Sequence, residues 1–155
     1  MPVFVADEQD AVEVDTAQIG SIARHVLFAE GYPESAELSI LLVTTDEIAG
    51  YNARFMSRQG PTDVLAFPLE QLAPGRVPPV EAKGPPLTLG DVVIAPEEIQ
   101  RQAADLGVPF KDELALMVVH GILHLLGWDH QNNAEADAME QREAGLLGAL
   151  GVTRR

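Results

Sequence analysis

Residues 112–130 read DELALMVVHGILHLLGWDH, and this stretch carries the strongest fold signal in the chain. Residues 112–126 are so apolar that they predict a helix buried in the core of the protein. Gly127 follows where this helix should end, because glycine readily adopts the positive φ that reverses the chain. Three of the four histidines, His120, His124 and His130, lie in this stretch. We therefore expect a buried helix with two histidines and a turn with a third.

The spacing of these histidines indicates a metal site. His120 and His124 are one helical turn apart, so their imidazoles project from the same face of the predicted helix. A turn at Gly127 brings His130 back toward them as a third ligand. Zinc is the expected ion, at Zn–N distances of about 2.0–2.1 Å, and three protein ligands leave a fourth position open for water. Such open sites are catalytic more often than structural, so we expect one Zn²⁺ ion at an active site.

The histidines and Gly127 also match the zinc signature of the metzincin peptidases, with one part missing. Gly121 occupies the place of the glutamate that acts as general base in that motif. Glycine cannot take a proton, so ordinary metallopeptidase chemistry is disfavoured. Asp129 could accept an N–H from a ligand histidine, orient the bound water, or cap the turn. The pattern predicts a metzincin-like zinc-site scaffold that performs a different reaction, with Trp128 packed beside the site.

Composition limits the possible functions. A chain of 155 residues has room for one domain, and 46% apolar residues are enough for a core. There is no cysteine, and the first ten residues carry acids rather than the basic start of a secretory signal. No apolar run approaches the roughly 20 residues of a membrane helix. We expect a single domain over residues 1–155, soluble and cytoplasmic, with no membrane partner.

The net charge bears on nucleic-acid binding. Ten Lys and Arg against 24 Asp and Glu give −14, which opposes non-specific binding to polyanions. Proteins that bind nucleic acid normally carry a basic surface. Any function on RNA must therefore use a local positive patch together with the metal ion.

Four short apolar runs predict β-strands at residues 3–6, 36–43, 64–67 and 92–94. Only a loop separates the last two, and such neighbours can pair antiparallel. Pro68 marks the end of a strand or the edge of a sheet. The loop at residues 69–88 holds five of the eleven prolines and should lie at the surface. Loops of this length are usually functional or disordered.

Capping signals predict where the other helices begin. The capping pairs are Asp15–Gln18, Thr44–Glu47 and Asn132–Glu135. The helices that they open should end near residues 31, 56 and 147, and no functional role is expected for His25 on the first. Pro96 suits the first turn of another helix, to about residue 106. Together these elements predict an α+β fold, a small mixed sheet of about four strands with about five helices.

The histidine motif and two companion segments resemble a known family. HGILHLLGWDH at residues 120–130 is similar to the H-G-x-L-H-L-x-G-[YW]-D-H motif of the YbeY family of bacterial endoribonucleases. PTDVLAFP at residues 61–68 and LGDVVIA at residues 89–95 agree with this family in order and spacing. The resemblance covers roughly residues 3–147.

The resemblance implies a metal-dependent hydrolase, a nuclease specific for single-stranded RNA. Its expected roles are 16S ribosomal RNA 3′-end maturation and ribosome quality control, with the ribosomal small subunit and assembly factors as partners. It gives His120, His124 and His130 the zinc-ligand role. Zinc in this site would lower the pKa of a bound water toward about 7 and polarise a phosphoryl oxygen. The activated water, with help from Asp129, or the ribose 2′-hydroxyl could then attack the phosphate, and both routes stay open.

Arginines before the P-T-D segment are the candidates to contact phosphate. Many members of the family carry an arginine where this chain has Met56, and Arg54 and Arg58 flank that position. Either could neutralise the charge that develops on the phosphate. Thr62 and Asp63 are expected to satisfy backbone donors at the start of a strand rather than to act in catalysis.

Two other functions fit the residues. A peptidase or amidase could use the same ligands, although it would lack its general base. A non-enzymatic ribosome-assembly factor with a structural zinc would suit the negative charge and Met56.

Overall fold

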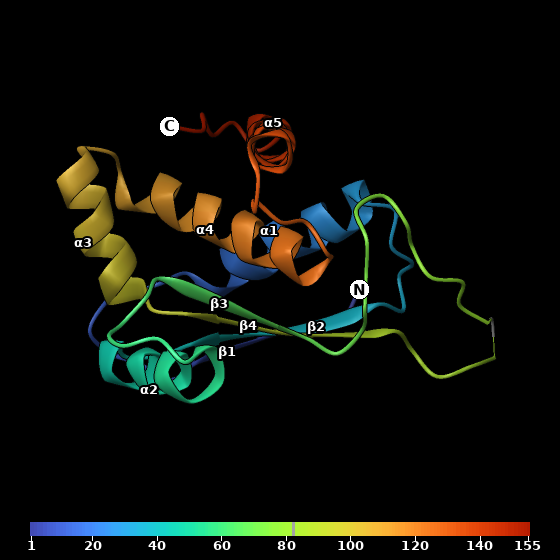
Figure 1. Cartoon of the computed structure of the whole chain (residues 1–155), viewed down its shortest axis with the longest axis horizontal. Coiled ribbons are helices and arrows are strands. Elements are labelled where there is room, and N and C mark those ends of the chain that lie inside the picture. Colours follow the sequence, from blue (N-terminus) through green and yellow to red (C-terminus); the bar gives the residue numbers. More distant parts are fainter. Residues whose placement is uncertain (82) are drawn as a thin grey trace.

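The computed structural model describes residues 1–81 and 83–155, which form a mixed four-stranded sheet packed with helices (Figure 1). In chain order the elements are β1 (Val3–Asp7), α1 (Thr16–Ala29), β2 (Glu37–Leu42), α2 (Thr45–Met56), β3 (Val64–Pro68), β4 (Thr88–Ile94), α3 (Pro96–Leu106), α4 (Phe110–Leu125) and α5 (Asn133–Gly148). The strand order is β1-β2-β4-β3, and β3 runs antiparallel to β4 at one edge while the other pairs are parallel. The predicted α+β class and the antiparallel pair are confirmed.

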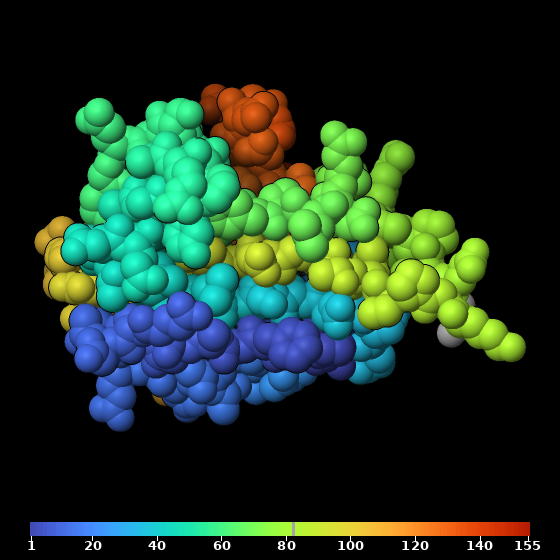
Figure 2. All heavy atoms as spheres, turned by 90° about the horizontal axis from the view of Figure 1, so that it is seen from below, coloured from blue at the N-terminus to red at the C-terminus, as the bar shows by residue number. Residues whose placement is uncertain are grey.

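The helices cover the two faces of the sheet differently. Helices α1 and α4 lie on one face, α5 lies beyond α4, and α2 lies on the opposite face (Figure 1). The main core fills the space between the sheet, α1 and α4, and a smaller cluster lies under α2. Figure 2 shows this face of the sheet. Helix α2 covers only part of it, and strands lie side by side next to the helix. Helix α4 is enclosed by the sheet and by other helices. Most of its side chains are therefore buried, which accounts for its apolar sequence.

Side-chain caps confirm the predicted helix starts. Asp15, Thr44 and Asn132 precede α1, α2 and α5, and each side chain accepts the backbone N–H of the residue three positions on. Pro96 lies in the first turn of α3, as expected. Among the described helices, none has both the length and the apolar character required to cross a membrane.

Two elements begin earlier than the sequence predicts. Strand β4 starts at Thr88 rather than at residue 92, because the chain around Gly90 pairs with both neighbouring strands. Gly90 has a φ of 134°, and a Cβ there would lie 2.2 Å from the carbonyl oxygen of Phe67. This glycine therefore permits a close approach of two strands. Helix α4 starts at Phe110, because the carbonyl of Pro109 already accepts the first helical N–H groups.

Residues 69–87 form the predicted surface loop between β3 and β4, with Ala82 outside the described residues. Leu72 and Val77 pack against the core, and Ala73 forms an isolated β-bridge with Arg76. The first part of the loop is therefore held against the body of the protein.

A buried carboxylate links α3, α4 and the residues after α5. Glu113, in the first turn of α4, is 1% exposed. Arg155 donates to both of its oxygens at 2.7 and 3.1 Å, and Gln102 of α3 also donates to it. Burial raises the pKa of Glu113, but these hydrogen bonds and the charge of Arg155 lower it by more, so the net shift is downward. The carboxylate is therefore ionised in the folded protein at neutral pH.

This contact predicts a loss of stability in acid. A glutamate whose pKa is lowered by folding stabilises the native state above its unfolded pKa, ordinarily 4.5. That contribution disappears as the pH falls from there through the lower folded pKa. Glu113→Gln should reduce the free energy of unfolding at neutral pH by about 1–3 kcal/mol. The gap between the two proteins, measured by urea unfolding, should shrink as the pH is lowered below 4.5. A gap independent of pH would contradict an ionic origin.

Candidate metal centre

The end of α4 positions the three histidines. His120 and His124 lie on its last turns, half-buried, and Gly127 follows with a φ of 99°. The N–H groups of Gly127 and Trp128 donate to carbonyls in the last turn of the helix, at 3.0 Å each. A Cβ at residue 127 would lie 2.2 Å from the carbonyl oxygen of Leu72, in the loop after β3. Glycine is therefore required by both the backbone conformation and the space.

The turn brings His130 back to the helix. Asp129 accepts the backbone N–H of His130 through Oδ1 at 2.8 Å, so of its predicted roles the capping of the turn is observed. The His130 ring centroid lies 4.9 Å from that of His124 and 5.7 Å from that of His120. One ring nitrogen from each histidine lies within 4.8 Å of the other two. The convergence predicted from the spacing is confirmed, and the three nitrogens can contact one ion.

The surroundings favour a metal-binding form of His124. Its pKa is lowered by burial first and then by the neighbouring rings of His120 and His130, while Asp129 acts in the opposite direction. A neutral imidazole keeps the lone pair that a metal requires.

Sequence reasoning missed one residue of this site, the carboxylate of Glu143. It lies on α5, is 1% exposed, and its Oε2 is 2.6 Å from Nδ1 of His120. Burial raises the pKa of Glu143, but the contacts with His120 and Arg154 lower it by more. The spacing between residues 120 and 143 carries no signal of this contact, because the packing of α5 on α4 alone brings the two residues together.

Close packing against the sheet explains why residue 121 is a glycine. A Cβ at this position would lie 2.8 Å from a methyl group of Val64 and 2.8 Å from one of Val92. Residue 121 therefore lies against the sheet, where α4 approaches β3 and β4 closely. A larger side chain would meet the strands there, so the packing of α4 on the sheet accounts for the glycine.

The histidines open onto a cleft of about 570 Å³ beside β3. Its lining residues are Asn52, Met56, Arg58, Thr62, Asp63, Val64, Leu65, Ala66, Pro68, His120, Gly121, His124, Asp129 and His130. Of the two candidate arginines, only Arg58 lines the cleft. The guanidinium of Arg54 instead lies 5.6 Å from the centre of the Phe55 ring. The structure therefore brings Arg58, and not Arg54, together with the histidines.

The remaining singled-out residues have structural partners. Asp63 accepts the N–H of Val64 at 2.9 Å, which is the predicted role at the start of a strand, although Thr62 and Asp63 also line the cleft. Trp128 packs against the core and donates through Nε1 to Glu30 at 2.9 Å. Nε2 of His25 lies 3.1 Å from the carbonyl oxygen of Leu146, away from the cluster.

The fold is α+β, and three histidines converge beside an open cleft at the end of a buried helix. These features define a class of α+β proteins with a candidate metal centre. Residues 4–151 match the family model described as Endoribonuclease YbeY. The chain belongs to the endoribonuclease YbeY family.

Curated relatives agree with this assignment, and a solved structure shares the fold. The chain is 42% identical to Endoribonuclease YbeY of Salinispora tropica, covering 99% of each protein. It is 41% identical to the protein of the same name from Pelotomaculum thermopropionicum, over 99% of this chain and all of that one. The solution structure of TM1509 from Thermotoga maritima is similar with a TM-score of 0.59 and 21% identity, over 96% of this chain and 91% of that one. At this identity the likeness shows the fold alone.

Proposed function

We propose that this protein is a zinc-dependent endoribonuclease that cleaves single-stranded RNA in the cleft beside His120, His124 and His130. The main support for this proposal is that three histidine nitrogens converge on the wall of an open cleft, in a chain of the endoribonuclease YbeY family. Three imidazoles suit zinc and leave a coordination position for water or substrate. The donor set therefore fits the metal.

The reaction divides between the metal and the residues of the cleft. Bound zinc would supply Lewis acidity, which activates water and neutralises charge on a phosphoryl oxygen. Arg58 would bind a non-bridging phosphate oxygen and orient the scissile bond. Asp129 lines the same cleft, and we assign it the role of proton acceptor in the absence of a carboxylate at residue 121.

The substrate follows from the family. We assign to the chain the maturation of the 3′ end of 16S ribosomal RNA and a part in ribosome quality control. Its partners would be the ribosomal small subunit and assembly factors, in the cytoplasm, and residues 1–155 would act as one domain. The resemblance of the three motifs and the match over residues 4–151 support this assignment.

The net charge of −14 opposes RNA binding, because RNA is a polyanion and the protein repels it. Asp63 and Asp129 line the cleft, and Arg58 is the one permanently cationic side chain among its described lining residues. A divalent cation on the histidines would add positive charge at the same place. RNA binding should therefore depend on the metal and on Arg58 together.

This charge distribution predicts different effects for the two candidate arginines. Arg58→Ala should lower kcat/KM for a single-stranded RNA by roughly 10- to 100-fold, because a charged hydrogen bond to phosphate is lost. Arg54→Ala is the matched control, since its guanidinium lies against Phe55, and cleavage should stay within about twofold of wild type. Zinc content should be unchanged in both. Equal losses in the two variants would refute the specific role of Arg58.

The function is tested by metal analysis and RNA cleavage on the same purified protein. Elemental analysis should find one zinc per chain, and a chelator should abolish cleavage of a single-stranded RNA while circular dichroism shows that the fold persists. A zinc-loaded protein that cuts no RNA and unfolds on chelation would point to a structural zinc instead. Products with 2′,3′-cyclic phosphate ends would show that the ribose 2′-hydroxyl is the nucleophile.

A further inference from the structure

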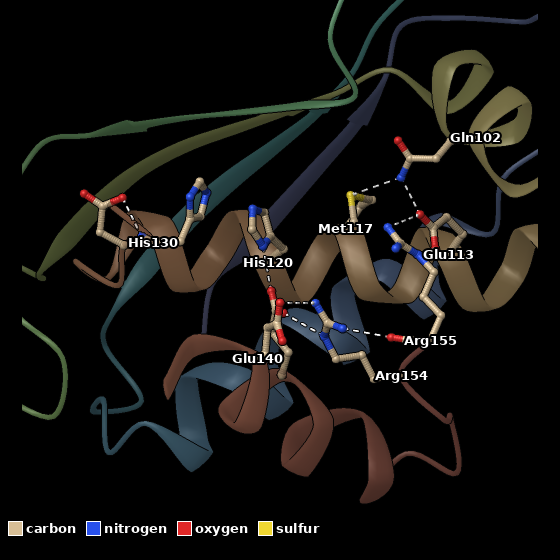
Figure 3. Close-up of polar contacts among 10 residues, drawn as sticks. Gln102, Glu113, Met117, His120, His130, Glu140, Arg154 and Arg155 are labelled. Atoms are coloured by element: carbon tan, nitrogen blue, oxygen red, sulfur yellow. Dashed lines mark hydrogen bonds and ion pairs between the residues drawn. The ribbon is translucent and has the colours of Figure 1, made fainter. Parts of the chain in front are cut away.

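A line of polar contacts runs from the candidate metal centre to a residue beyond α5. Oε2 of Glu143 lies 2.6 Å from Nδ1 of His120, and Arg154 donates through Nε to Oε1 of Glu143 at 3.0 Å. The side chain of Glu143 is 1% exposed and that of Arg154 is 21% exposed. In Figure 3 the dashed lines run from His120 to α5 and on to Arg154. Each oxygen of the buried carboxylate therefore has a defined partner.

These contacts determine which nitrogen of His120 is available to a metal. A carboxylate can only accept a hydrogen bond, so Nδ1 of His120 donates to Glu143, and Nε2 is the ring nitrogen left for a metal. Metal-ligating histidines almost always donate their second N–H to such a partner, which fixes the orientation of the ring and raises its basicity. Glu143 has the place and the chemistry of that partner.

We propose that Glu143 and Arg154 are positioning residues of the metal centre. Glu143 directs Nε2 of His120 toward the ion, and Arg154 holds the carboxylate in the orientation that does so. Both act through His120. The inference rests on the proposed function, since it requires the three histidines to bind a divalent cation.

Zinc affinity of the full chain, measured by competition with a chromophoric chelator, tests the proposal. Glu143→Gln keeps the size of the side chain and removes its charge, whereas Arg154→Ala removes the support behind it. Each should weaken zinc binding about 10- to 100-fold, and Arg154→Lys should recover part of the loss. Because Arg154 acts through Glu143, adding Arg154→Ala to Glu143→Gln should weaken binding little further.

Arg155→Ala is the matched control. Arg155 follows Arg154 in the chain and also pairs with a buried carboxylate, that of Glu113, which contacts Gln102 and not a histidine. Its removal should lower the melting temperature and leave zinc affinity unchanged. Nitrogen NMR of the imidazoles adds a direct readout. Nδ1 of His120 should carry the hydrogen in the wild type, and the two tautomers should mix in Glu143→Gln.

The outcomes separate this inference from the proposed function. Wild-type zinc affinity in folded Glu143→Gln and Arg154→Ala proteins would overturn the positioning role and leave the metal centre standing. Equal weakening in Arg155→Ala would also overturn it, because the effect would then come from general stability. A wild-type chain that binds no zinc would overturn the metal centre and the positioning role with it.

Discussion

His124→Ala is expected to abolish zinc binding and RNA cleavage while leaving the protein folded. His124 is central in the cluster, with ring centroids 4.7 Å from His120 and 4.9 Å from His130. Its loss leaves two ligands, and one of these is on an exposed turn. Since the loss of a partner behind a ligand already weakens metal binding 10- to 100-fold, the loss of a ligand should exceed about 100-fold. Alanine favours the helix, so α4 should persist.

Elemental analysis after dialysis against a defined free zinc concentration measures this effect. His25→Ala is the matched control, because His25 contacts the carbonyl of Leu146 and lies outside the cluster. The control should bind zinc and cut RNA as the wild type does. Full zinc occupancy in His124→Ala would show that the cluster is not the metal centre.

Gly127→Ala should be strongly destabilising and should also weaken zinc binding. At a φ of 99° a residue with a Cβ is strained by about 1–3 kcal/mol. The added Cβ would also lie 2.2 Å from the carbonyl oxygen and 2.6 Å from the carbonyl carbon of Leu72, which are backbone atoms. Either the loop after β3 or the turn to His130 must move. The loss in free energy of unfolding should therefore exceed the strain alone.

Gly145→Ala provides the comparison for Gly127→Ala. Gly145 lies within α5, and apart from its chain neighbours and the adjacent backbone of that helix, no described heavy atom lies within 4 Å of a Cβ added there. Alanine in a helix interior is favoured over glycine by up to about 1 kcal/mol, so this variant should be as stable as the wild type or more stable. Urea unfolding and zinc titration of both variants measure the difference. Wild-type stability and wild-type zinc affinity in Gly127→Ala would contradict the requirement for glycine at this turn.

Much of the fold could be predicted from short stretches of the chain. Asp15, Thr44 and Asn132 cap helices because their side chains bond to an N–H only three residues away. His120 and His124 share a face because one turn of helix separates them. Such features depend on neighbours in the chain, and no distant segment needs to be known. The start of β4 was predicted too late, because its first residues pair with strands that are remote in the sequence.

Some features of the site could likewise be predicted from local sequence, and others depended on the tertiary structure. The three histidines and the turn at Gly127 were visible in eleven consecutive residues, because helix geometry and glycine conformation bring their rings together locally. The choice between Arg54 and Arg58 was not visible there, since it depends on which guanidinium lines the cleft and which lies over the Phe55 ring.

Glu143 and Arg154 lie beyond any local pattern. Their contact with His120 exists because α5 packs across α4, and periodicity within one helix says nothing of the register between two. Gly121 was noticed for the missing base, but only the approach of α4 to Val64 and Val92 explains why no side chain fits there. Local sequence thus specified the cluster of three histidines, whereas long-range packing decided which side chains support it and which charged side chain lines its cleft.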